Sequence, residues 1–235
     1  MKFYPINLNL KDKRVLIVGA GRVALRKFER LLQIGKQIKQ IKVVSPEFNQ
    51  GFIPYLRQEQ GSNRFKFIQR EFKKKDLMGQ FLVFAATDKA KFNQQIALLA
   101  KEKNILVNII DNAQISDFTV PAAVNRGELL LTVSSGSNLP ALSKKVKEKL
   151  EQEFGLEYQI LLEVMKEKRA QIIAEIDEIS VRRSIFRKLA SDQFLNKIQI
   201  IIDQLNFDLE NNNLKQIFSK VEAEIDKIIA ELRDD

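Results

Sequence analysis

The sequence predicts an α/β protein that has a parallel sheet in its first half and helices in its C-terminal part. Through the first 110 residues, apolar β-rich runs alternate with helical patterns, as is typical of βαβ units. Three of these runs, VLIVG, FLVFAAT and ILVNII, are continuously apolar. Strands have this character when helices cover both faces of their sheet. From Leu156 onward no β-like run remains, and the tail is expected to be helical.

The expected elements of the first half follow one another in short steps. Strands are expected at 14–18, 41–45, 65–69, 81–86 and 105–110, and helices at 23–34 and 89–103. Further on, FTVPAAV and ELLLTVSS are β-like segments on either side of the turn-like tripeptide Asn125-Arg126-Gly127. This pattern predicts a hairpin. A helix is expected from Pro140 to about Glu153.

The helical tail carries two apolar faces. The members of each face recur at steps of three, four or seven residues, which places them on one side of a helix. The first set is Leu161, Met165, Ile172, Ile176 and Ile179, and the second is Leu214, Ile217, Phe218, Val221, Ile225, Ile228 and Ile229. Such faces predict a small helical bundle or a subunit contact. We expect the chain to divide into three parts: the α/β part at 1–112, the hairpin and its following helix at 113–150, and the helical tail at 151–235.

The composition restricts the chemistry. The chain has no cysteine, so it forms neither disulfides nor thiolate nucleophiles or ligands, and it has no histidine. Proton transfer therefore falls to Asp, Glu, Lys, Tyr or water, and no protein metal site is expected. The net charge is +9, but the basic residues are spread out and not interleaved with aromatics, which favours a solvated surface over nucleic-acid binding. With no apolar span and no secretory leader, we expect a cytoplasmic protein without a membrane partner.

The strongest local motif is VLIVGAGRVALRKF, in which a buried strand leads through Gly19-Ala20-Gly21 into a helix. This is the G-x-G-x-x-A form of the dinucleotide fingerprint. Gly19 allows the tight turn, Gly21 lets the backbone approach a pyrophosphate, and Ala24 lets the helix pack close to the strand. The N–H groups at the helix start favour an anion. The motif predicts a Rossmann domain that binds a dinucleotide.

Three further segments are candidates for the site. Ser45-Pro46-Glu47 follows the second strand, where Glu47 is placed to accept hydrogen bonds from a ribose, which favours NAD over NADP. Asp111 follows the last strand of the sheet and is either the proton acceptor or a turn-forming residue. Ser134-Ser135-Gly136 precedes a helix start and suits an anionic ligand, although such segments are also ordinary strand-to-helix loops.

Taken in order, these motifs resemble one family. VGAGRVALRK, VVSPEF, AATD, VNIID, the hairpin and SSGSNLPALS resemble the precorrin-2 dehydrogenase/sirohydrochlorin ferrochelatase module, which occurs alone or at the N-terminus of siroheme synthase. The resemblance covers about residues 1–155. It departs from the family at Ser137, Asn138 and Leu139, where a second glycine is common. Because the chain ends at Asp235, uroporphyrinogen methylation by a fused module is not expected.

The resemblance implies an N-terminal Rossmann domain, a small β-hairpin dimerisation region and a C-terminal helical domain, assembled as a homodimer. It also implies NAD-dependent oxidation of precorrin-2, a tetrapyrrole, to sirohydrochlorin. In this family Arg22, Val23, Pro46 and Glu47 match the NAD contacts, Asp111 matches the aspartate used in dehydrogenation, and Ser135 matches a serine that lines the tetrapyrrole site.

Two alternatives stay open at this stage. Some family members also insert ferrous iron as a second substrate, and the sequence does not decide between the two kinds. From a different class, a Rossmann domain can bind NAD as a regulatory sensor without catalysis, because a fold does not fix a function.

Overall fold

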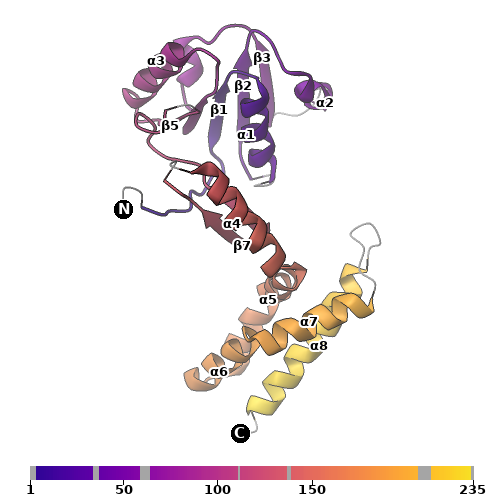
Figure 1. The fold of residues 1–235 in the computed structure, drawn as a ribbon. Helices are drawn as coiled ribbons and strands as arrows, with labels where there is room; N and C mark the ends of the chain where they lie inside the picture. Colours follow the sequence, from indigo (N-terminus) through magenta and orange to yellow (C-terminus); the bar gives the residue numbers. More distant parts are fainter. Residues whose placement is uncertain are drawn as a thin grey trace. The chain divides into compact units, whose positions relative to one another are not determined.

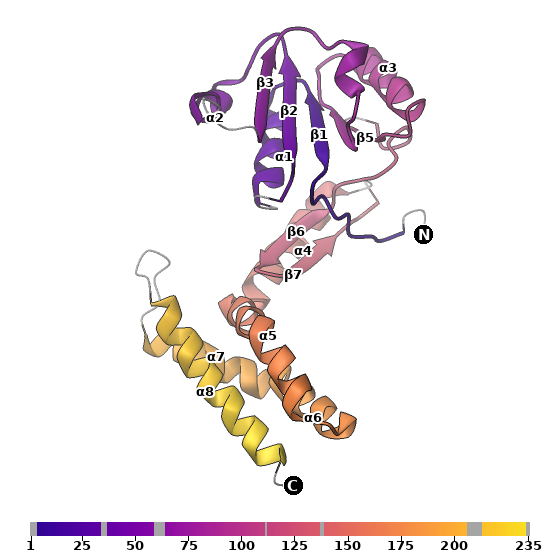
Figure 2. The same cartoon turned by 180° about the vertical axis from the view of Figure 1, so that it is seen from behind.

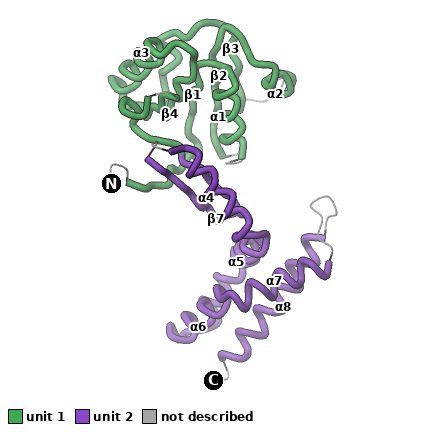
Figure 3. The backbone as a smooth tube through the Cα atoms, viewed as in Figure 1, with its two compact units in different colours: residues 1–120 green, residues 121–235 purple. Residues whose placement is uncertain are grey.

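The computed structural model describes residues 4–33, 37–58, 64–110, 112–136, 139–205 and 213–233. The chain folds into two units, residues 1–120 and 121–235, which Figure 3 colours separately. The first is an α/β unit built on a five-stranded sheet, and the second combines a two-stranded hairpin with helices. This confirms the predicted fold class. The three-part division expected from the sequence stays a prediction.

The sheet of the first unit is fully parallel, with strand order β3-β2-β1-β4-β5 (Figure 1). Along the chain, β2 and β3 are added on one side of β1, and β4 and β5 are then added on its other side. Its strands are β1 (Arg14–Val18), β2 (Gln40–Ser45), β3 (Phe65–Gln69), β4 (Leu82–Ala85) and β5 (Leu106–Ile109). The reversal between β1 and β4 is the switch point at which ligands of such sheets bind.

Two helical layers cover the sheet, as Figures 1 and 2 show from opposite sides. Ile17 packs with helix α1 (Arg22–Gln33), whereas Leu16 packs with α3 (Ala90–Lys101), because successive strand residues point to opposite faces. On the α1 face, the ring of Phe28 is the centre of an aromatic cluster that also includes Phe52, Tyr55, Phe65 and Phe67. The remaining short elements are η1 (Gln50–Phe52), α2 (Ile53–Gln58) and η2 (Lys74–Leu77).

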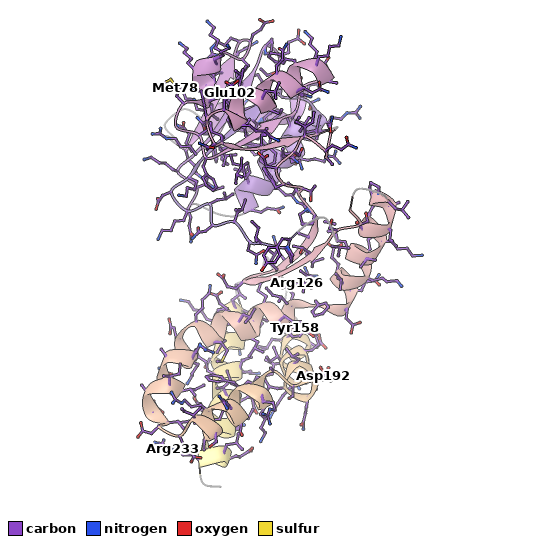
Figure 4. The ribbon with its side chains drawn as sticks, turned by 90° about the vertical axis from the view of Figure 1, so that its left-hand side faces the viewer. Met78, Glu102, Arg126, Tyr158, Asp192 and Arg233 are labelled. Atoms are coloured by element: carbon purple, nitrogen blue, oxygen red, sulfur yellow. The ribbon has the colours of Figure 1, made fainter. Side chains whose placement is uncertain are left out.

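The second unit begins with the predicted hairpin, but its turn lies further along the chain. Strand β6 (Ala122–Arg126) pairs antiparallel with β7 (Leu129–Val133), so Asn125 and Arg126 belong to the strand and not to the turn. The turn is made at Gly127, whose φ of 61° suits a glycine. Arg126, labelled in Figure 4, donates from Nε to the carbonyl oxygen of Phe154 at 2.6 Å. The guanidinium thus fastens the strand to a helix end.

In the described residues of this unit, five helices follow the hairpin. They are α4 (Pro140–Glu153), which packs on the hairpin, and α5 (Leu156–Glu175), α6 (Ile179–Leu189), α7 (Asp192–Gln204) and α8 (Leu214–Arg233). Helices α5 to α8 share one apolar core, which confirms a bundle. The first predicted face was wrong at its end. Helix α5 ends at Glu175, so Ile179 starts a new helix and is 59% exposed. Among the described residues, no helix is long and apolar enough to cross a membrane.

An ion pair between Arg70 and the buried Asp76 links the end of β3 to η2. Asp76 is 3% exposed and accepts hydrogen bonds from both terminal nitrogens of Arg70, at 2.7 and 2.8 Å, and from the N–H of Lys73. Burial alone raises the pKa of the Asp76 carboxyl, but these hydrogen bonds and the charges of Arg70 and Lys42 outweigh it. The net result is a lowered pKa, so the ionised form stabilises the fold.

Replacing Asp76 with Asn should therefore lower the melting temperature at neutral pH. The stabilisation that Asp76 provides is present above the unfolded-state pKa of about 4 and is lost as the pH falls through the lower folded-state pKa. The variant should accordingly lose less stability than the wild type on acidification, as followed by thermal unfolding across pH. Glu71→Gln, an exposed neighbouring change, is the control. Identical acid profiles for Asp76→Asn and the wild type would contradict this account.

Candidate functional site: the glycine turn and the carboxyl edge of the sheet

The glycine turn lies where β1 ends, at the switch point of the sheet. Gly19 has a φ of 100°, and a Cβ on it would lie 2.3 Å from the carbonyl oxygen of Ala86. The turn after β1 and the loop after β4 therefore touch backbone to backbone. Only glycine fits there, both for its φ and for the space.

Gly21 is the opposite case. It is exposed, and a Cβ built on it would meet no atom within 4 Å. The fold itself thus has room for a side chain at this position. Helix α1 begins at the next residue, and its first N–H groups have no partner within the helix. An open space at a helix start, bounded by backbone donors, fits the pyrophosphate of a dinucleotide.

Backbone hydrogen bonds tie the neighbouring loops to this turn. The N–H of Gly19 donates to the carbonyl of Val44 at 2.9 Å, and the N–H of Asn49 donates to that of Ala20 at 3.0 Å. The predicted segment 45–47 lies between these two ties. The Ser45 hydroxyl donates to the carbonyl oxygen of Glu47 at 2.6 Å, so Ser45 shapes the loop, while the Glu47 side chain is exposed. The glycine turn and the candidate ribose residue are thus brought together.

The loop after β4 has a positioning residue that the sequence analysis missed. Asn93 on α3 is completely buried; its Oδ1 accepts from the Thr87 hydroxyl at 2.6 Å and its Nδ2 donates to the Thr87 carbonyl at 2.9 Å. These hydrogen bonds hold the loop after β4, which lies against Gly19. An asparagine within an apolar helical pattern was the available signal, but its partner could not be read from the sequence.

Asp111 itself lies outside the described residues, so its role stays a prediction. The residues on either side form hydrogen bonds of different kinds. The N–H of Ile110 donates to the Ala85 carbonyl at 3.2 Å, and Asn112 Oδ1 accepts from the N–H of Gln114 at 3.0 Å. The chain then runs back beside β5. There the side chain of Ser116 accepts a hydrogen bond from the N–H of Ile109, and that of Asp117 accepts one from the N–H of Val107. This segment covers the free edge of the last strand.

Ser134, Ser135 and Gly136 belong to the second unit and precede α4. The Ser135 hydroxyl donates to the Leu139 carbonyl at 3.0 Å, and Ser134 Oγ accepts from the N–H of Gly136 at 3.3 Å. Both hydroxyls therefore shape the loop and keep lone pairs for a ligand. Ser137 and Asn138, where the sequence departs from the family, lie outside the described residues.

In the part of the chain that the structure describes, no group of three or more acidic, His or Cys side chains is placed to hold a metal ion. A shallow hollow of about 350 Å³ lies elsewhere, between η2 and the end of α3, where Figure 4 labels Met78 and Glu102. Its lining includes no residue of the predicted site. The hollow is therefore separate from the glycine turn.

A family of putative NAD(P)-binding domains matches residues 6–122, the part of the chain that contains the glycine turn and the loops around it. Siroheme synthases from Photobacterium profundum and Chromobacterium violaceum are 30% and 33% identical over 194 and 183 residues. These alignments cover 83% and 78% of this chain. The solved structure of SirC, a precorrin-2 dehydrogenase, superposes with a TM-score of 0.65 at 21% identity, covering 94% of this chain and 100% of SirC.

Over residues 6–122 the chain belongs to the family of putative NAD(P)-binding domains, and it is similar to siroheme synthases over 83% of its own length. The structural likeness shows the shared fold, and the family match supports the predicted NAD cofactor. This chain spans about 40% of the length of the first siroheme synthases it matches.

The two glycines of the turn should respond differently to the same substitution. Gly19→Ala should lower the free energy of unfolding by about 2–4 kcal/mol, through backbone strain and overpacking. Gly21→Ala should leave stability within about 0.5 kcal/mol of wild type. It should nevertheless weaken NAD binding on the order of tenfold, a cost of about 1.4 kcal/mol. Thermal unfolding and a calorimetric titration with NAD measure both effects. An unchanged NAD affinity in Gly21→Ala would mean that the pyrophosphate binds elsewhere.

Proposed function

We propose that this chain is an NAD-dependent precorrin-2 dehydrogenase, which oxidises precorrin-2 to sirohydrochlorin in siroheme biosynthesis. The observation that carries the proposal is the glycine turn at the switch point, closed by backbone at Gly19 and open at Gly21. Its position in a chain of this family supports a redox role over that of a passive sensor. The cytoplasmic location and the homodimer expected from the sequence are parts of the same proposal.

The residues of the turn would hold the dinucleotide. N–H groups at Arg22 and Val23 would donate to the pyrophosphate, which the dipole of α1 also favours. Glu47 would accept from the adenosine ribose hydroxyls, so that the adenosine end lies on the β2 side of the turn. NAD supplies the hydride acceptor of the reaction. The task of the chain is to bind it in one orientation beside the substrate.

On the other side of the switch point, Asp111 would accept the proton that the substrate loses. It follows β5, whose neighbour β4 ends beside the glycine turn. The residue before it, Ile110, donates its N–H to the Ala85 carbonyl, which keeps the end of β5 beside β4. With no histidine in the chain, a carboxylate is a natural general base. Ser134, Ser135 and Gly136 would contact the tetrapyrrole.

An anaerobic assay with precorrin-2 and NAD tests the proposal directly. We expect NADH and sirohydrochlorin to form together in equal amounts, as followed by absorbance. A chain that binds NAD by calorimetry but leaves precorrin-2 unchanged would be a regulatory NAD-binding module instead. Adding ferrous iron to the completed reaction then asks whether sirohydrochlorin is also converted to siroheme.

Asp111→Ala should reduce the rate of precorrin-2 oxidation by about 10²–10⁴-fold, because a positioned general base contributes on that order. NAD affinity should stay unchanged, since Asp111 is not expected to hold the dinucleotide. Asp117→Ala is a useful control, because Asp117 is the other aspartate near β5 and accepts from the Val107 N–H. Near-wild-type turnover in Asp111→Ala would reject the proposed role.

A further inference from the structure

Helix α1, which begins at the glycine turn, carries a stripe of four cations: Arg22, Arg26, Lys27 and Arg30. At about 100° per residue, these four positions fall within an arc of about 140° around the helix axis. Among the described residues, Arg22, Arg26 and Lys27 form no ion pair with a carboxylate. The stripe is therefore a concentration of positive charge beside the proposed cofactor site.

The acidic residue of α1, Glu29, is on the side of the helix away from Lys27. It lies about 160° around the helix from Lys27. Its Oε1 accepts a hydrogen bond from the Tyr55 hydroxyl of α2 at 3.3 Å. Glu29 is thus on the flank of α1 that faces α2.

Lys27 lies on the other flank, toward β4. Its ammonium group is 5.5 Å from the ring centroid of Phe84, a β4 residue that is 5% exposed. The Phe84 ring in turn packs against Phe118 at a centroid distance of 5.8 Å. Ile17 of β1 pairs with Phe84, so this contact lies one residue before the end of each strand. The cation is therefore next to the switch point, on its β4 side.

The position of Lys27 is unfavourable for a charge without an anionic partner. Burial, followed by repulsion from Arg30 and Arg26, lowers the pKa of Lys27 to about 8. The aromatic ring offsets only part of the cost of removing an ammonium group from water. A bound anion would offset the rest and restore the charged form.

The side of the helix indicates which anion this is. In the proposed function, the adenosine ribose is held after β2 and the proton acceptor follows β5. The β4 flank of α1 is accordingly the flank nearer the reacting end of the cofactor, where the substrate must lie. A tetrapyrrole substrate with many carboxylates would bring anions to that end.

We propose that Lys27, with Arg26 and Arg30 beside it, forms a subsite on the β4 flank of α1 that binds a carboxylate of the tetrapyrrole substrate. This inference rests on the proposed function for the identity of the substrate. It assigns Lys27 to substrate binding and leaves the dinucleotide phosphates to the glycine turn.

The test compares Lys27→Met, Lys27→Arg and the wild type in binding sirohydrochlorin without NAD, by fluorescence titration. Lys27→Met keeps the aliphatic stem and removes the charge, so affinity should fall by about 10- to 100-fold, as for loss of a charged hydrogen bond. Lys27→Arg should retain affinity within about threefold. In turnover, Lys27→Met should raise KM for precorrin-2 and leave kcat nearly unchanged. Lys91→Met, an exposed change on α3 across the sheet, is the matched control and should behave as wild type.

The pH dependence gives a second readout. Charged groups that act on Lys27 are Arg26 and Arg30 of its own helix, while β4 offers the uncharged ring of Phe84. Because the ammonium loses its proton near pH 8 in the free protein, wild-type affinity for sirohydrochlorin should fall between about pH 7 and 9. Lys27→Arg should show no such fall, since guanidinium stays charged.

Each outcome decides the inference. Equal sirohydrochlorin affinity in Lys27→Met and wild type would overturn it and leave the proposed function standing. Loss of NAD affinity in Lys27→Met, with sirohydrochlorin binding intact, would also overturn it and assign the cation to a dinucleotide phosphate. A wild-type chain that neither binds nor produces sirohydrochlorin would reject the proposed function and this inference together. Melting temperatures of the variants close to wild type would exclude misfolding as the cause of weaker binding.

Discussion

The contact of two backbone segments at Gly19 is the constraint on which the rest of the proposed site depends. Because no side chain separates the turn after β1 from the Ala86 carbonyl, the loop after β4 can reach the glycine turn. The hydrogen bonds from Gly19 to Val44 and from Asn49 to Ala20 add the loop after β2. Three loops are thereby fixed around one helix start. A site formed in this way before its ligand arrives avoids part of the ordering cost of binding.

Helix α1 divides the surroundings of this turn into two chemically different sides. On the α2 side, Glu29 and Tyr55 share a hydrogen bond, whereas on the β4 side Lys27 lies against an aromatic ring. Part of the overall charge of +9 is therefore concentrated on one face of α1. Clefts and surfaces of one sign attract ligands of the other. The cofactor and an anionic substrate can then bind at different positions around the same helix.

The sequence predicted the parallel sheet and each of its five strands, because buried strands are continuously apolar over a few neighbouring residues. It also placed both glycines of the turn correctly. It missed Asn93, and it gave no role to Ser116 and Asp117, which accept hydrogen bonds from β5. These polar residues resemble ordinary loop or helix residues until their partners, six to ten positions away, are known. The hairpin turn was misplaced for a related reason. Arg126 is held in strand β6 by a bond to Phe154, 28 residues further on.

What the sequence determined by itself is the set of local features: the order of the elements, the glycine fingerprint and the absence of histidine and cysteine from the chemistry. Periodicity and turn preference act over a few residues, so they can be read from the chain directly. The tertiary structure alone decided which glycine has backbone against it and which has open space, and which flank of α1 places an ammonium group against an aromatic ring. Those properties depend on atoms contributed by distant segments, since steric room and desolvation arise only once the strands and helices have packed.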